Sequence, residues 1–143
     1  MIGSARNWRE TPQRYRYEAA RCTRCGQAFF PPRAVCRHCR GREFEKTTLA
    51  GEGILETFTV IRVAPSGFVD QVPYAVGIVS LPGDVKVTAQ IVDGDPEALA
   101  IGDRVKLEFR RVRQDGESGI LCYGYKFVPV REHRGPTPSP ERI

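Results

Sequence analysis

Residues 22–41 read CTRCGQAFFPPRAVCRHCRG, and this stretch decides how the rest of the chain can be interpreted. It holds two Cys-x2-Cys pairs, Cys22 with Cys25 and Cys36 with Cys39, and ten residues separate them. A two-residue spacer lets each pair form a tight turn that directs both thiolates at one metal ion, and four thiolates are a common ligand set for Zn²⁺. We therefore predict a zinc site formed by these cysteines, with a disulfide framework or a redox pair as the alternatives.

The segment between the two pairs has too few apolar residues to bury a core, so the metal must hold it together. Gly26 and Gly41 follow the pairs, and we expect them to supply the positive φ that such turns need. Four thiolates leave no open coordination position, which favours a structural zinc over a catalytic one. His38 could replace a cysteine, but we interpret it as a solvated surface residue.

Composition limits the architecture to one ordinary domain and a small satellite, because the chain has 143 residues and 41% hydrophobic side chains. It contains no run of 18 apolar residues that could span a membrane. Residues 1–6 lack the apolar stretch of a secretory signal, so we expect a cytoplasmic protein with reduced cysteines. The fifth cysteine, Cys122, lies in an apolar run and is expected to be buried rather than nucleophilic.

Positive charge is concentrated at the N-terminal end. Residues 1–46 hold eleven Lys or Arg against four Glu, whereas the remaining residues hold eleven basic and thirteen acidic side chains. A surface with such an excess favours an anionic partner, which could be nucleic acid, the phosphates of a nucleotide-like cofactor or an acidic protein face. The alternative is that the charge only keeps a small module soluble.

Ahead of the cysteines, residues 7–21 contain good helix formers interrupted by Pro12. We predict two short helices with a break near Thr11, which could cap the second one. Trp8, Tyr15 and Tyr17 cannot be buried by helices this short, so they must pack on the rest of the chain or on another protein.

After residue 46 the chain favours β-structure, since its segments are rich in β-branched and aromatic residues or alternate polar with apolar ones. A short helix is expected between the third and fourth strands, with Asp95 as its cap and Pro96 at its first position, and Gly102 after it. This order matches an OB-fold, a small five-stranded barrel; an unrelated five-stranded barrel is the alternative. The predicted strands cover residues 53–63, 74–81, 85–92, 104–112 and 119–128.

Alternation within the last two strands predicts which side chains share a face. In the fourth strand we expect Val105, Leu107 and Phe109 to point inward. In the fifth, one face is expected to carry Tyr123, Tyr125 and Phe127, and the other Cys122, Gly124 and Lys126. The predicted fold is therefore mainly β, with a helical arm at 1–21, a four-cysteine zinc ribbon at 22–46, an OB-fold barrel at 47–130 and a disordered tail at 131–143.

This order of parts resembles the DUF35 family of zinc-ribbon and OB-fold proteins. The resemblance is carried by the four cysteines together with WRETPQRYR at 8–16, FPPR at 30–33 and YGYKF at 123–127, and extends to VAPSGF at 63–68 and QIVD at 90–93. It implies a small non-catalytic subunit, encoded beside thiolases and related condensing enzymes, that binds acyl-CoA or bridges enzymes.

The residues of this chain are compatible with such a role. Coenzyme A needs basic side chains for its phosphates, an aromatic or apolar platform and an extended groove. For CoA, acyl-CoA or the entrance to their site, the candidates are Phe68, Tyr74, Tyr123, Tyr125, Lys126 and Arg33. For docking on a partner, the candidates are Trp8, Tyr15, Tyr17, Arg14 and Arg16. The alternative for each aromatic residue is that it belongs to the core.

We therefore expect a non-catalytic subunit of a hetero-oligomer with a thiolase-fold enzyme: a thiolase, an acyltransferase or a 3-hydroxy-3-methylglutaryl-CoA synthase. Catalysis by this chain alone is not expected, because four cysteines bind metal and no activated nucleophile remains. A different class of function is a single-stranded nucleic-acid-binding OB-fold, although the slightly acidic barrel half argues against it. A third possibility is a purely structural adaptor with no ligand.

Overall fold

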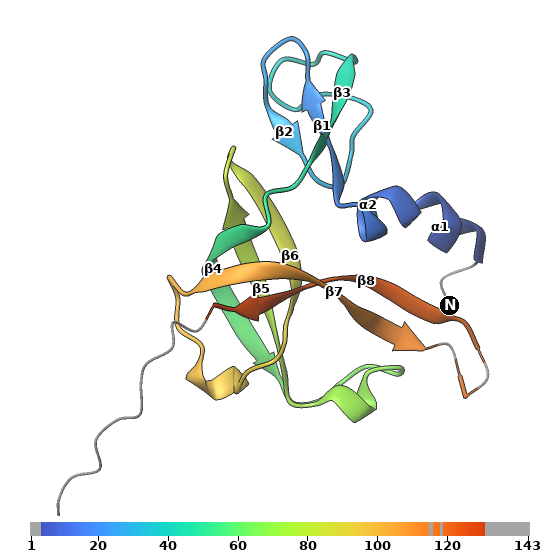
Figure 1. The fold of residues 1–143 in the computed structure, drawn as a ribbon, viewed down its shortest axis with the longest axis vertical. Helices are drawn as coiled ribbons and strands as arrows, with labels where there is room; N and C mark the ends of the chain where they lie inside the picture. The colour runs from blue at the N-terminus through green and yellow to red at the C-terminus, as the bar shows by residue number, and fades with distance from the viewer. Residues whose placement is uncertain (1–3, 115, 118, 131–143) are drawn as a thin grey trace, which may run out of the picture.

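The computed structural model describes residues 4–114, 116–117 and 119–130, which form three connected parts. A three-stranded ribbon sheet stands on one end of a five-stranded barrel, and a helical arm extends from the ribbon along the barrel (Figure 1). Residues 131–143, for which we predicted a disordered tail, lie outside the described residues. The mainly β fold predicted from the sequence is confirmed.

The arm consists of the helices α1 (Ser4–Arg9) and α2 (Thr11–Tyr15). The break falls next to Thr11 as predicted, but Glu10 is the N-cap residue and makes no side-chain cap, while the Thr11 hydroxyl donates to the Asn7 carbonyl at 3.2 Å. The helical segment is also shorter than predicted, because residues from Glu18 onward form strand β1 instead. Pairing with a neighbouring strand outweighs the helix propensity of these residues.

The ribbon contains β1 (Glu18–Cys22), β2 (Ala28–Phe29) and β3 (Phe44–Thr48), ordered β2-β1-β3 and antiparallel throughout. In its central strand, Ala20 lies opposite Phe29 on one side and Lys46 on the other. Cys22 therefore ends β1 and Cys25 lies in the loop that leads to β2, while Cys36 and Cys39 lie in the loop from β2 to β3. Both loops reach the end of the sheet that lies away from the barrel (Figure 1).

The barrel closes in the order β4-β5-β6-β8-β7, which is that of an OB-fold. Adjacent strands are antiparallel except β6 and β8, which meet in parallel through one pair, Ile91 with Phe127. A 3₁₀ turn, η2 (Pro96–Ala98), lies between β6 and β7, and the Asp95 carboxylate caps it by accepting from the Glu97 amide at 3.0 Å. The strands are β4 (Glu52–Ile61), β5 (Tyr74–Leu81), β6 (Val85–Ile91), β7 (Arg104–Gln114) and β8 (Leu121–Pro129).

The barrel interior holds the apolar core, in which Leu55, Val79, Val105 and Phe127 are completely inaccessible to solvent. Phe30 from the ribbon belongs to the same cluster of buried residues, and its ring lies 5.2 Å from that of Tyr125, edge to face. The ribbon is therefore packed directly on the barrel, and the two parts share one continuous core.

Strands β7 and β8 continue past the barrel as a two-stranded extension. Near their barrel ends they pair with β4 and β6, whereas residues 108–114 and 121–126 form strand pairs only with each other among the described strands. The predicted inward orientation of Phe109 is wrong: its side chain is 40% exposed, because it lies beyond the part of β7 that pairs with β4, on a face that Tyr15 of the arm covers only partly. Cys122 is buried as expected.

Candidate functional site

The four cysteines of the two pairs converge on one point at the tip of the ribbon. All four Sγ atoms lie within 4.8 Å of one another, with Cys22 to Cys39 and Cys25 to Cys36 both at 3.5 Å. Around a zinc ion with bonds of about 2.3 Å, the sulfur atoms of a tetrahedron lie about 3.8 Å apart. The cluster therefore fits the predicted zinc site, and the ion would complete a closed four-thiolate sphere.

The two cysteine loops are built alike, which explains why they present matching ligands. The amide of the residue four positions after the first cysteine donates to that cysteine's carbonyl, from Gly26 to Cys22 at 2.8 Å and from Arg40 to Cys36 at 3.0 Å. The positive φ that we expected at both glycines occurs at Gly26 (75°) and at Arg40 (58°). Gly41 instead leaves room for the cysteine sulfur atoms, since a Cβ there would lie only 3.3 Å from Cys39 Sγ.

Backbone amides also favour the thiolate form of the first cysteine in each loop. The Cys39 amide donates to Cys36 Sγ at 3.5 Å, and hydrogen bonding from this amide is the main reason that the pKa of Cys36 falls to about 6. The Cys25 amide lowers the pKa of Cys22 in the same way. A thiolate is the form that binds Zn²⁺, so these amides favour metal binding at Cys22 and Cys36. Burial and hydrogen bonding among the crowded thiols raise the pKa of Cys25 and Cys39 instead.

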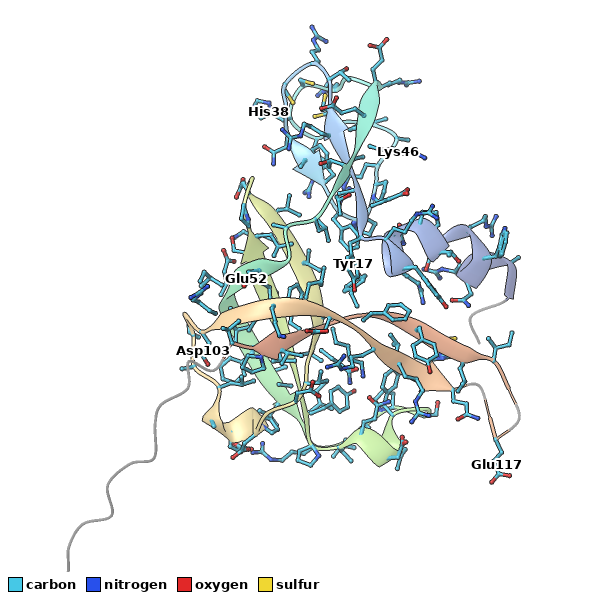
Figure 2. The ribbon with its side chains drawn as sticks, in the orientation of Figure 1. Tyr17, His38, Lys46, Glu52, Asp103 and Glu117 are labelled. Atoms are coloured by element: carbon cyan, nitrogen blue, oxygen red, sulfur yellow. The ribbon has the colours of Figure 1, made fainter. Side chains whose placement is uncertain are left out.

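His38 lies beside the cluster but is exposed, and its ring is absent from the group of converging ligand atoms found in the described residues. Figure 2 shows it on the outside of the ribbon. Its interpretation as a surface residue agrees with this placement.

A second candidate site is an open cavity of about 470 Å³ between the arm and the barrel, which we call the arm–barrel cavity. It lies over the place where β6 and β8 meet through a single pair. Four of the six residues predicted for CoA line it: Phe68, Tyr74, Tyr125 and Lys126. Phe68 and Lys126, which are 58 positions apart in the sequence, are thus brought to one site.

The arm forms one wall of this cavity and is fixed by Glu10. The Glu10 carboxylate accepts from Arg6 Nε at 2.8 Å and from Arg14 Nε at 3.0 Å, and it also pairs with Arg14 Nη2. Hydrogen bonding from Arg6 is the largest cause of its lowered pKa. Arg14, a predicted docking residue, therefore belongs to the cavity wall and is held by its own helix.

The opposite wall is aromatic. The rings of Phe68 and Tyr74 lie 6.0 Å apart, and Tyr125 packs on Phe30 from the ribbon. Burial raises the pKa of the Tyr125 hydroxyl. Neutral aromatic walls next to charged arm residues suit a ligand that is partly apolar and partly ionic.

The cavity also reaches a buried amine. Lys126 is 6% exposed, and its Nζ donates to Gln71 Oε1 at 3.4 Å. The same oxygen accepts from Gln90 Nε2 at 3.2 Å, while Gln71 Nε2 donates to the Val112 carbonyl. Gln71 had no recognisable signal in the sequence, because one amide in a loop resembles any other.

Tyr123 and Arg33, also predicted for CoA, lie elsewhere. The Arg33 guanidinium carbon is 6.0 Å from the centre of the Phe29 ring, at a separate hollow between ribbon and barrel that Arg37 and Lys86 also line. Tyr123 stacks on Phe109 with ring centres 5.4 Å apart and an interplanar angle of 19°. The predicted set of six is thus divided among three places.

An aromatic patch lies on the β7–β8 extension and consists of Tyr15, Phe109 and Tyr123. The ring of Tyr15 from α2 is 5.0 Å from that of Phe109, which in turn stacks on Tyr123. Leu121, two positions before Tyr123 on the same strand face, is also exposed. Alternation had predicted an inward Phe109, so the sequence alone did not reveal this patch.

The remaining docking candidates have different surroundings. Trp8 is 79% exposed on α1, and Arg16 is exposed and paired with Glu18 at 2.8 Å. Tyr17 is only partly exposed and lies between the ribbon and the barrel in Figure 2, where burial raises the pKa of its hydroxyl. Trp8 and Tyr15 therefore remain available to a partner, whereas Tyr17 contributes to the junction.

None of the helices in the described part of the chain is long and apolar enough to cross a membrane.

Comparisons with known proteins agree with the two-part architecture. Residues 9–45 match the family model described as the rubredoxin-like zinc ribbon domain of ChsH2, and residues 46–110 match its C-terminal OB-fold domain. A DUF35 domain-containing scaffold protein of Methanothermobacter thermautotrophicus is 42% identical over 130 residues, covering 90% of this chain and 98% of the relative.

Two further similar proteins have enzyme names in their descriptions. The benzoylsuccinyl-CoA thiolase subunit BbsA of Thauera aromatica is 35% identical over 110 residues, covering 77% of this chain and 74% of the relative. A solved structure titled Ltp2-ChsH2(DUF35) aldolase aligns with a TM-score of 0.68 and 26% identity, covering 85% of this chain and 91% of that one.

Proposed function

The chain belongs to the DUF35 family, and we propose from this membership that it is a non-catalytic subunit that docks on a thiolase-fold enzyme. Support comes from similar proteins described as a scaffold protein and as a thiolase subunit, and from a similar structure titled Ltp2-ChsH2(DUF35) aldolase. A thiolase, an acyltransferase and a 3-hydroxy-3-methylglutaryl-CoA synthase are the partners that we consider first. The complex would be a hetero-oligomer.

The aromatic patch is the observation that carries the docking proposal. Tyr15, Phe109 and Tyr123 form a continuous ring stack that the rest of the described chain leaves partly open to solvent. Exposed aromatic clusters of this kind mark interaction sites, because aromatic side chains dominate the binding energy of protein interfaces. Trp8 would add a further anchor on the same arm.

Catalysis is assigned to the partner, because this chain offers no activated nucleophile in its described residues. Four of its cysteines converge on the metal site, and Cys122 is buried. His38 is exposed on the ribbon, away from both cavity walls. Acyl transfer through cysteine needs a thiolate with a positioned base, and no such pair is formed here.

The arm–barrel cavity would bind part of CoA or acyl-CoA. Its aromatic walls and arginine-bearing arm offer the apolar surface and the positive charge that an acyl thioester of a nucleotide needs. A ligand held there would be delivered to the docked enzyme at high local concentration.

Docking is tested by purifying the chain from its native host and identifying a co-purifying thiolase-fold enzyme. Phe109→Ser should then weaken the complex at least about tenfold, because it removes the central ring of the patch. Val63→Ser is the matched control, since Val63 is 90% exposed in the loop after β4 and is not one of the patch residues. Equal affinities of the two variants for the enzyme would remove the patch from the interface.

Nucleic-acid binding is separated from CoA binding by titration with CoA and with a single-stranded oligonucleotide at two salt concentrations. The proposal expects saturable CoA binding that Phe68→Ala weakens. Recovery of nucleic acid without any enzyme, together with tight and salt-dependent oligonucleotide binding, would overturn it.

A further inference from the structure

Lys126 is the one buried charged side chain found in the described residues, and its position calls for an explanation. It lies on β8, next to Tyr125, and lines the arm–barrel cavity. Burying an ammonium group without a counter-charge is costly, so proteins place lysine there only when something compensates for the charge.

Nothing in the described residues compensates for it fully. The closest partner is the neutral Gln71 Oε1 at 3.4 Å, a long hydrogen bond that is shared with Gln90. No carboxylate of the described chain forms an ion pair with Lys126, and Asp93, whose charge acts to raise the pKa of Lys126, pairs with Arg110 at 2.8 Å. Burial, reinforced by Arg111, lowers the pKa of Lys126.

The rest of the cavity also offers no free carboxylate to Lys126. Among its lining residues, three cations face one carboxylate, and that carboxylate, Glu10, is already occupied by Arg6 and Arg14. Beside this positive site stand the apolar surfaces of Phe68 and Tyr74, whose rings lie 6.0 Å apart. The lining thus combines one uncompensated ammonium with an apolar wall.

We propose that the arm–barrel cavity binds a small organic acid, whose carboxylate pairs with Lys126 and whose apolar body lies against Phe68 and Tyr74. The cavity volume of about 470 Å³ falls in the range that takes small molecules. A carboxylate at Lys126 replaces a long neutral contact by a charge-assisted hydrogen bond, which is the stronger kind. Gln90, at the same site, offers an amide for the second carboxylate oxygen.

The acid has two sources, a free carboxylic acid or the far end of an acyl group carried by CoA. In the second case the inference deepens the proposed function and rests on it. In the first case the inference does not depend on a partner enzyme. Both sources are therefore tested on the isolated full-length chain.

Isothermal titration with octanoate and with 1-octanol is the primary experiment. Octanoate should bind the unchanged chain more tightly than octanol does. Lys126→Met should weaken octanoate binding about 10- to 100-fold, because a charged hydrogen bond is lost, and leave octanol binding within about twofold. Lys86→Met is the matched control, since Lys86 is exposed and paired with Glu56 at 2.8 Å outside this cavity.

Folding is checked in the same variants. Lys126→Met should melt at the same temperature as the unchanged chain or higher, because it removes an uncompensated buried charge. Lys126→Arg, which keeps a positive charge, should restore octanoate binding at least partly. Absence of octanoate binding, or equal octanoate affinity in the unchanged chain and Lys126→Met, would overturn the proposal.

Adipyl-CoA and hexanoyl-CoA distinguish the two sources, because they differ in the terminal carboxylate. Tighter binding of adipyl-CoA that is lost in Lys126→Met assigns the acid to an acyl group on CoA. Octanoate binding without any CoA-ester binding assigns a free acid; the CoA part of the proposed function then fails while this inference stands. If CoA esters bind, Phe68→Ala weakens that binding and the terminal carboxylate makes no difference, the CoA part of the proposed function stands and this inference fails.

Discussion

The ribbon and the barrel reach stability by different means, although they are joined in one chain. The barrel buries large apolar side chains, with Leu55 and Phe127 completely inaccessible to solvent. In the ribbon, the residues buried most deeply around the sheet's tip are Cys22 and Cys36, and β2 has only two residues. Hydrophobic burial therefore supports the barrel, whereas metal coordination must support the tip of the ribbon.

The comparison also shows where the two mechanisms meet. Phe30 leaves the ribbon and enters the barrel's buried cluster beside Tyr125, so the metal-supported part is fixed to the part with an apolar core. The arm continues from the ribbon and closes one wall of the arm–barrel cavity. A zinc ion at the tip would therefore act on the cavity only indirectly, through strand β1, which joins the arm to Cys22.

Removing the metal should have the largest effect. Structural zinc contributes about 10–16 kcal/mol of apparent binding free energy in small domains, so Cys36→Ser should unfold the ribbon while the barrel stays folded. Metal analysis should find about one zinc per chain in the unchanged protein, and backbone amide NMR should lose the ribbon signals in the variant. Cys122→Ser is the control that keeps zinc. A folded ribbon without metal would contradict the comparison.

Truncating the barrel core should come next. Phe127→Ala should lower the free energy of unfolding by about 3–5 kcal/mol, because it leaves a cavity where the ring was completely buried. Denaturant unfolding measures the loss, and zinc content should stay unchanged if the chain remains folded. Release of zinc at the same denaturant concentration as barrel unfolding would show that the ribbon depends on the barrel as much as on its metal.

Cutting the connection between the two parts should have a smaller effect on stability. Phe30→Ala should cost about 3 kcal/mol and loosen the ribbon relative to the barrel, which ¹⁵N relaxation would detect. Phe29→Ala is the matched control, since Phe29 packs on Phe44 within the ribbon at 6.2 Å. Equal ribbon mobility in both variants would show that Phe30 is not the connection.

The close approach of Gly53 in β4 to Ser80 in β5 tests how tightly the barrel wall is packed. A Cβ at Gly53 would lie 2.5 Å from the Ser80 carbonyl oxygen, so Gly53→Ala should destabilise the barrel by about 1–3 kcal/mol. Gly51→Ala meets nothing within 4 Å and should change stability little. Thermal melting of both variants provides the comparison. Similar melting temperatures would mean that β4 and β5 can move apart enough to accept the methyl group at little cost in stability.

The smallest expected effect is on pH dependence. Burial lowers the pKa of Lys126 in the folded state, so the unfolded chain binds more protons between the folded value and the ordinary 10.5. Stability should therefore rise with pH in that interval, and the rise should be absent in Lys126→Met. Denaturant unfolding of both proteins at several alkaline pH values measures the difference. Parallel pH profiles would indicate that Lys126 is solvated.

The strand order and the metal ligands could be predicted because they depend on local patterns. Val85, Val87 and Ile91 alternate with polar residues and lie buried in β6, and the cysteine spacing alone indicates the four ligands. The same reasoning failed for Phe109, since alternation gives a face but not whether a barrel lies behind it.

The sequence by itself determined a zinc ribbon before an OB-fold, because both are specified by spacing and periodicity within short segments. Only the tertiary structure decided which predicted CoA residues meet. It brought Phe68, Tyr74, Tyr125 and Lys126 to one cavity, and it moved Arg33 and Tyr123 away. Such placement depends on how the arm, the ribbon and the β6–β8 contact pack together, and those long-range contacts have no signal in any single segment.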